Sequence, residues 1–181
     1  IWPEVGISTE TAPYLGLTGP CATSLDHGGV IFAPGGAVMV DGYFNLFNLS
    51  KWRDCCGEMP LSLQLRGRGR FQLTVWLASR ERSWERIHCE PVSIEGDLVL
   101  PLDLSAATLP RMLLFFELVA LSEGALEDFA WGTPMPPRQT PDLMLSVTTF
   151  RREAEVADTV ARFRRFRATS PLRDHIRMLV V

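Results

Sequence analysis

The chain has 181 residues, 46% of them hydrophobic, and 18 Lys and Arg residues against 21 Asp and Glu residues give it a formal net charge of −3. This length suits one complete domain and part of a second, because domains commonly run to about 100–200 residues. The apolar content excludes a disordered chain, and the acidic excess argues against a nucleic-acid-binding protein. No apolar run approaches the roughly 20 residues that span a bilayer, and the start of the chain lacks the pattern of a signal peptide.

The first predicted strands are two short ones in VIFAPGGAVMVDGYF, residues 30–44, on either side of the turn signal Pro34-Gly35-Gly36. The segment NLSKWRDCCG, residues 48–57, then predicts a short helical turn. Ser50 is the expected cap of this turn, and Gly57 is its expected end.

Strict alternation of apolar and polar residues predicts a β-hairpin in LSLQLRGRGRFQLTVWLAS, residues 61–79, with its turn at the Arg-Gly-Arg-Gly sequence. Residues 83–104 predict two more strands, interrupted at Glu95-Gly96-Asp97, and RMLLFFELVAL, residues 111–121, predicts a central strand that is apolar on both faces. Short strands spaced in this way predict an antiparallel β-sandwich or jelly-roll domain over residues 1–133.

A different pattern follows a proline-rich stretch. Four prolines between residues 134 and 141 predict a stiff linker. Beyond it, residues 143–150 predict a buried strand, residues 153–166 a helix, and residues 174–181 a second strand. Such a β-α-β unit needs a larger parallel sheet to cover its faces. We therefore expect residues 142–181 to be the truncated start of an α/β, nucleotide-binding domain.

Ligands of open α/β sheets bind beyond the carboxyl ends of the strands, which here is the segment Thr148-Thr149-Phe150-Arg151-Arg152. The glycine-rich patterns of dinucleotide sites and P-loops are absent, so side chains would make the contacts, with an arginine available to a phosphate or a uracil carbonyl. The alternative is an ordinary strand-to-helix turn with solvated arginines.

The four cysteines show no disulfide framework, because Cys55 and Cys56 are adjacent and Cys21 and Cys89 stand alone. A structural zinc site has ligands two to four residues apart, and His88 with these cysteines does not give that spacing. We interpret them as ordinary thiols and expect no metal site in this chain.

Two motifs resemble a known enzyme family. VTTFRREAEVADTVARF, residues 147–163, resembles the opening of inverting family-2 glycosyltransferases with a GT-A fold, whose first strand ends in a Thr-Phe-Asn-Arg type motif. Residues 43–76 resemble the β-rich amino-terminal domain of bacterial galactofuranosyltransferases that polymerise the cell-wall galactan. The second resemblance is carried by Tyr43, Phe44, Asn45, Trp52, Arg53, Arg66, Gly67, Arg68 and Gly69.

The resemblance implies that Thr149 and Phe150 line the nucleotide pocket and that Arg152 contacts the uridine diphosphate (UDP) of the donor, whereas Arg151 stands where the family has Asn. The family's uracil-reading residue, its metal-binding Asp-x-Asp and its general base would follow Val181. The implied function is the amino-terminal region of an enzyme that transfers a sugar, such as galactofuranose, from a UDP-sugar to a glycan acceptor. The parent enzyme would use Mn²⁺ or Mg²⁺, and this fragment would be inactive and hold no catalytic residue.

The implied partners are the UDP-sugar donor and the glycan acceptor, without nucleic acid. We expect a cytoplasmic location, which includes the inner face of the membrane. Peripheral membrane association and assembly into a homo-oligomer are compatible with this expectation. The alternative is a non-catalytic carbohydrate-binding or oligomerisation β-sandwich module.

Two groups of side chains in the β-rich part have competing interpretations. Trp76, Trp84 and Trp131 are aromatics that could stack on sugars or pack in the core. The arginines of the RGRGR stretch, residues 66–70, could contact nucleic acid. Alternation with glycine and the negative net charge instead favour a turn whose arginines meet carboxylates of the catalytic domain or of a neighbouring subunit.

Overall fold

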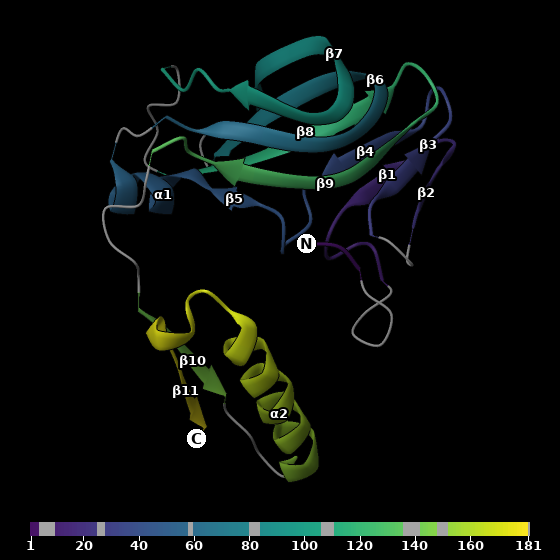
Figure 1. The fold of residues 1–181 in the computed structure, drawn as a ribbon. Helices are drawn as coiled ribbons and strands as arrows, with labels where there is room; N and C mark the ends of the chain where they lie inside the picture. The colour runs from purple at the N-terminus through teal and green to yellow at the C-terminus, as the bar shows by residue number, and fades with distance from the viewer. Residues whose placement is uncertain are drawn as a thin grey trace. The chain divides into compact units, whose positions relative to one another are not determined.

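The computed structural model describes residues 1–3, 10–24, 28–57, 60–79, 84–105, 111–135, 142–147 and 152–180. The chain divides into two compact units, Ile1–Met135 and Pro136–Val181, each of which is described by itself. The expectation of a mostly β protein is confirmed, since strands make up most of the first unit and two more lie in the second (Figure 1). None of the described helices is long and apolar enough to cross a membrane.

The first unit is one antiparallel sheet that curls until it nearly closes into a barrel (Figure 1). The order along it is β1-β4-β8-β6-β9-β3-β2, with β5 also paired to β8 and β7 to β6. The elements are β1 (Gly16–Thr18), β2 (Cys21–Thr23), β3 (Val30–Phe32), β4 (Ala37–Val40), β5 (Phe47–Asn48), α1 (Leu49–Cys56), β6 (Ser62–Ser79), β7 (Trp84–Pro101), β8 (Met112–Ala120) and β9 (Gly124–Gly132).

The hairpin predicted within residues 61–79 is wrong. These residues form one continuous 18-residue strand, β6, which pairs along almost its whole length with the equally long β7. On its other edge, the first part of β6 pairs with β9 and the second part with β8. The interruption predicted at Glu95-Gly96-Asp97 is likewise absent, because β7 continues through it. The β6–β7 pair therefore crosses from one half of the barrel to the other.

Glycines allow β6 to make this crossing. A Cβ at Gly67 would press against the backbone carbonyl oxygen of Ala125 on β9, so the two strands can approach only because the side chain is missing. Gly96, which lies opposite Gly67 on β7, has a φ of 86°, a value that favours glycine. The glycines that the sequence analysis assigned to turns thus serve a strand bend.

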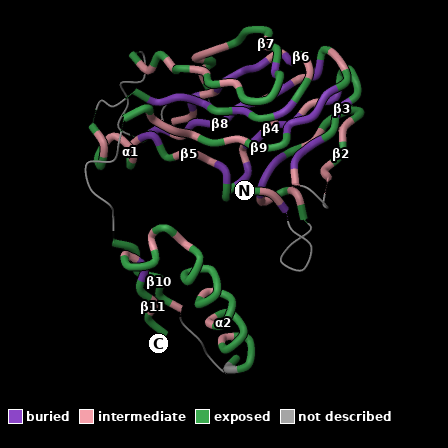
Figure 2. Tube along the Cα trace, viewed as in Figure 1, coloured by how far each residue is buried: buried purple, intermediate pink, exposed green. Residues whose placement is uncertain are grey.

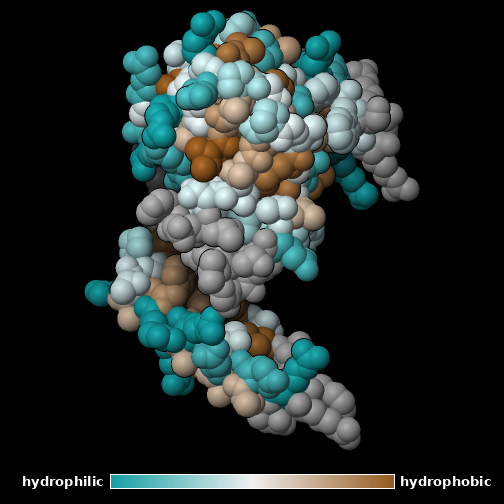
Figure 3. Space-filling model, turned by 90° about the vertical axis from the view of Figure 1, so that its right-hand side faces the viewer, coloured by the Kyte–Doolittle hydropathy of each residue, from teal (hydrophilic) through white to brown (hydrophobic). Residues whose placement is uncertain are grey.

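The core lies on the inward face of the curled sheet, where alternate residues of β6 and β8 are buried (Figure 2). The larger of two clusters contains Leu63, Leu65, Phe71, Leu73, Val75, Phe116 and Leu118, among others. The smaller cluster lies where α1 packs on the sheet and contains Leu49, Leu61, Leu77, Met112 and Leu114. Hydrophobic groups also reach the surface among hydrophilic ones, as the side of the molecule drawn in Figure 3 shows.

The helix α1 begins earlier than Ser50, the cap expected from the sequence. Asn48 is its N-cap, and the side-chain oxygen of Asn48 accepts a hydrogen bond from the backbone N–H of Lys51 at 3.0 Å. The hydroxyl oxygen of Ser50 instead accepts a hydrogen bond from the backbone N–H of Met112 at 2.8 Å, which ties α1 to β8. The helix ends at Gly57 as expected, with a φ of 67°.

The second unit contains a strand, a helix and a strand in the predicted order, but β10 is not the buried strand expected, since four of its five residues are exposed. Its described elements are β10 (Leu143–Val147), α2 (Glu153–Thr169), the 3₁₀ helix η1 (Arg173–His175) and β11 (Ile176–Val180). β10 and β11 are parallel neighbours, and α2 lies between them in the chain. Most of the linker predicted at residues 134–141 lies outside the described residues.

Candidate functional site

The predicted nucleotide-binding residues belong to the connection between β10 and α2. Of these, Thr149 and Phe150 lie outside the described residues, as do Thr148 and Arg151. Arg152 is described, and it directly precedes the first turn of α2 with an exposed side chain. Its backbone carbonyl oxygen accepts a hydrogen bond from the N–H of Val156 at 3.0 Å, while its side chain makes no capping bond. The guanidinium is therefore not used to close the helix end.

The start of α2 is suited to an anion. The first backbone N–H groups of an α-helix have no partner within the helix, and the helix dipole places partial positive charge there. The guanidinium of Arg152 adds a full positive charge next to this end, and the exposed carboxylate of Glu155 in the first turn offsets part of it. A phosphate or carboxylate group would gain from the helix end and from the guanidinium, whereas the glycine-rich cradle of other phosphate sites is absent from the sequence.

The arginines of the RGRGR stretch lie on the outer face of β6. The Nε of Arg66 donates to Oδ1 of Asp97 on β7 at 2.7 Å, and Arg68 lies 3.9 Å from a carboxylate oxygen of Glu127 on β9. The bond to Asp97 raises the pKa of Arg66. The partners of Arg66 and Arg68 are thus carboxylates of neighbouring strands in the same unit. Since all four side chains are more than half exposed, the pairs contribute little stability.

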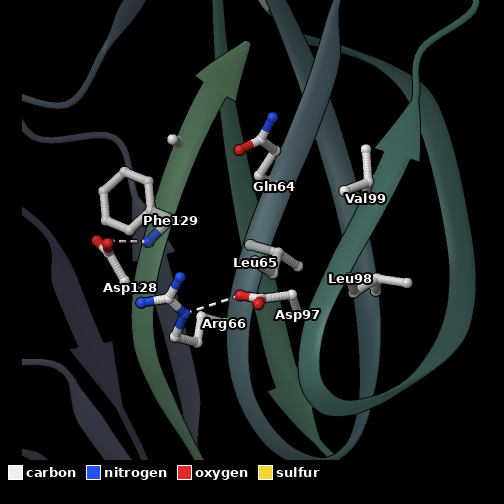
Figure 4. Close-up of a pocket in the computed structure, with 9 residues that line it drawn as sticks. Gln64, Leu65, Arg66, Asp97, Leu98, Val99, Asp128 and Phe129 are labelled. Carbon is white, nitrogen blue, oxygen red and sulfur yellow. Dashed lines mark hydrogen bonds and ion pairs between the residues drawn. The ribbon is translucent and has the colours of Figure 1, made fainter. Parts of the chain in front are cut away.

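A shallow groove of about 310 Å³ lies beside the Arg66–Asp97 pair (Figure 4). Three adjacent strands line it, with Gln64 and Arg66 from β6, Asp97 and Val99 from β7, and Asp128 from β9. The carboxylate of Asp128 accepts a bond from the backbone N–H of the next residue at 2.9 Å. The charged groups of this groove are thus already engaged with one another or with the backbone.

Three aromatic rings gather elsewhere on the outer face of the sheet. Trp84 at the start of β7 lies 5.0 Å from Phe115 and 6.0 Å from Trp76, measured between ring centroids. Phe115 is buried and Trp76 half-buried, but 53% of Trp84 is exposed. Trp131 instead packs 5.4 Å from Phe47 and belongs with the core. Of the three tryptophans considered from the sequence, Trp84 therefore offers the most open ring.

Beside Trp84 lies a cavity of about 760 Å³, more than twice the volume of the groove in Figure 4. This volume falls within the roughly 300–1,000 Å³ typical of small-molecule sites. We call it the Trp84 cavity; its described lining is Asn48, Ser50, Lys51, Asp54, Ala78, Ser79, Trp84, Arg111, Met112 and Leu113. The sequence does not point to the polar residues of this cavity, because they come from three distant segments and form no local motif.

The residues that carry the resemblance to galactofuranosyltransferases differ in how far their side chains are buried. Tyr43 and Phe44 are exposed, whereas Asn45 is buried. The side-chain amide of Asn45 donates to the carbonyl oxygens of Ile1 and Tyr14, at 2.9 Å each. Arg53 on α1 donates to the carbonyl oxygen of Leu104 at 3.2 Å. Asn45 and Arg53 thus have evident structural roles.

The cysteines are free thiols. Cys55 and Cys56 lie at the end of α1, and His88 and Cys89 lie on β7. In the described parts of the chain, no three His, Cys, Asp or Glu side chains come together in a way that could hold a metal ion.

No protein-family model matches the chain, and no curated protein matches it either. The resemblance to family-2 glycosyltransferases stays a prediction from the sequence motifs at residues 43–76 and 147–163.

Proposed function

We propose that this chain is the amino-terminal region of a glycosyltransferase that moves a sugar from a UDP-sugar donor to a glycan acceptor. The observation that carries the proposal is the parallel β10-α2-β11 arrangement with Arg152 at the start of α2. Sheets of this type bind ligands beyond the carboxyl ends of their strands, and Arg152 follows that end of β10. The choice of galactofuranose as the sugar comes from the resemblance.

The chemistry of this end fits a diphosphate. UDP presents its negative charge on phosphate oxygens, which accept charge-assisted bonds from a guanidinium and from the free N–H groups of a helix start. With no glycine-rich loop in the sequence, a side chain such as that of Arg152 has to supply part of the binding. Thr149 and Phe150 complete the proposed nucleotide pocket.

The proposal also accounts for the surface of the two C-terminal strands. Five of their apolar side chains, Leu143, Met144, Leu145, Leu179 and Val180, are each more than 40% exposed. Parallel strands are normally covered on both faces. Within the proposal, these strands belong to a larger GT-A sheet, and the barrel-like first unit is the β domain that precedes it.

The divalent metal of such an enzyme, Mn²⁺ or Mg²⁺, has no counterpart in the described residues. They hold no cluster of carboxylate, imidazole or thiol groups that could bind it. The role proposed for this chain is therefore to bind and orient the donor nucleotide, and no metal-dependent step is assigned to its residues.

Calorimetric titration of the full-length protein with UDP tests this role. Arg152→Ala should weaken UDP binding roughly 10- to 100-fold, because bonds to a charged group contribute about 1.5–3 kcal/mol. Arg165→Ala is the matched control, since Arg165 is also exposed on α2 but lies more than three turns away. Equal UDP affinity of the Arg152→Ala variant and the unaltered protein would show that the assignment is wrong.

The second candidate is a non-catalytic carbohydrate-binding or oligomerisation module. The Trp84 cavity favours its carbohydrate-binding form, because the cavity lies wholly within the first unit and does not involve α2. A full-length protein that binds saccharide but neither binds nor hydrolyses a UDP-sugar would support the module over the enzyme.

A further inference from the structure

We propose that the Trp84 cavity is a saccharide-binding site, in which Trp84 is the stacking platform and Lys51, Asp54 and Arg111 bind the substituents of the sugar. This site is separate from the proposed donor-nucleotide site and uses residues of the first unit alone. The binding of a saccharide in this cavity does not depend on the proposed function. The identity of that saccharide as the acceptor of a transferase does rest on the proposed function.

The aromatic part of the site is open yet held in place. The ring of Trp84 meets the buried Phe115 edge-to-face at 71°, and the half-buried Trp76 lies on the same outer face of the sheet. These contacts fix the ring while leaving 53% of the residue exposed. A platform that is already ordered costs little entropy when a ligand binds. A sugar ring has an apolar C–H face that can cover such an indole and remove both surfaces from water.

The polar part of the site supplies both hydrogen-bond donors and an acceptor. Lys51 and Asp54 are three residues apart on α1 and so lie on the same side of the helix, and Arg111 comes just before β8. All three side chains are exposed, and none forms an ion pair with another described residue. A sugar hydroxyl both donates and accepts, so it can use the carboxylate and the cations together.

The two walls of the cavity are fixed to each other. The bond from the N–H of Met112 to the hydroxyl of Ser50 joins the start of α1 to β8, and Asn48 caps the helix. The helix that carries Lys51 and Asp54 is therefore held beside the start of β8, which Arg111 directly precedes. Because the described lining carries two cations and one carboxylate, an acidic saccharide should bind more tightly than its neutral counterpart.

The experiment is an NMR titration of the ¹⁵N-labelled 181-residue chain with galactotetraose and, separately, with tetragalacturonate, a matched neutral and acidic pair. The indole N–H signals of the five tryptophans are followed, and the Trp84 signal is assigned by its loss in Trp84→Phe. We expect the Trp84 signal to shift saturably and the Trp131 signal to stay in place. Tetragalacturonate should bind about fivefold more tightly at low salt, with the difference shrinking as salt is added.

The variants are at exposed positions, so they should leave the fold intact and change only the binding of the saccharide. Asp54→Asn should weaken binding of galactotetraose about 5- to 10-fold, and the double variant Lys51→Gln with Arg111→Gln should abolish the preference for tetragalacturonate. Arg70→Gln is the control, since Arg70 is exposed on the same sheet outside the cavity. Absence of a Trp84 shift with either saccharide, or binding that Asp54→Asn leaves unchanged, would overturn the proposal.

The outcomes separate this site from the proposed enzyme. A protein that binds UDP through Arg152 but shifts no Trp84 signal with saccharide refutes the Trp84 cavity and leaves the donor site intact. A protein that binds saccharide at Trp84 but does not bind UDP refutes the enzyme and supports this site.

Discussion

At the scale of single residues, Gly67 controls how closely β6 approaches β9. The carbonyl oxygen of Ala125 occupies the place that a side chain at this position would need, and it belongs to the backbone of a paired strand. A larger residue can be accommodated only if the backbone moves.

Gly67→Ala is therefore expected to destabilise the first unit by about 1–3 kcal/mol, the usual range for overpacking a tight site. The measurement is urea-induced unfolding followed by tryptophan fluorescence. Gly16→Ala is the control, because no atom lies within 4 Å of the place that its Cβ would take, and its effect should stay within about 0.5 kcal/mol. Similar unfolding midpoints for both variants would show that β6 has no such close contact.

The sequence predicts the inward residues of β6 correctly but not the role of its glycines. Leu63, Leu65, Phe71 and Leu73 alternate with polar residues, and that period is enough to assign them to the core. Glycine in a turn and glycine at a close strand crossing produce the same local pattern. The deciding neighbour, Ala125, is 58 residues away in the chain.

At the scale of elements, the β6–β7 pair is the feature that organises the first unit. One edge of β6 pairs with β7, and its other edge pairs with β9 along the first part and with β8 along the second, so β6 joins both halves of the curled sheet. The local sequence predicts a break at the glycines of each strand, because the residues on either side have the pattern of separate short strands. Pairing between distant strands keeps β6 continuous, since its first half pairs with β9 and its second half with β8.

The continuity of β6 can be measured directly by NMR. We expect backbone contacts between Leu65 and Leu98 and between Phe71 and Val92, the pairs set by the antiparallel register. A hairpin turning at residues 66–70 would instead bring Leu65 next to Phe71. Observation of that contact, without those to β7, would contradict the single strand.

The first residue of helix α1 also could not be predicted from the local sequence. Both Asn48 and Ser50 are good N-cap residues, and the sequence alone does not rank them. The structure uses Asn48 as the cap because the hydroxyl of Ser50 is bonded to the N–H of Met112 on β8. A tertiary hydrogen bond thus determines where this helix begins.

At the scale of the whole molecule, the two proposed sites differ in how far the sequence could reveal them. Residues 148–152 are contiguous, so a motif can point to them, although Arg152 alone among them is described. The Trp84 cavity brings together residues 48–54, 78–84 and 111–113, which only the pairing of β5, β6 and β8 makes neighbours. Its tryptophan was noticed from the sequence, but its charged residues were not.

The most direct test of the central claim is the release of UDP by the full-length protein, measured with a UDP-hexose donor, UDP-galactofuranose among those tried, and a glycan acceptor. The account predicts release that depends on the acceptor, falls roughly 10- to 100-fold in Arg152→Ala and is unchanged in Arg165→Ala, because only Arg152 lies at the start of α2. No release with any donor, or equal rates for the unaltered protein and Arg152→Ala, would contradict it.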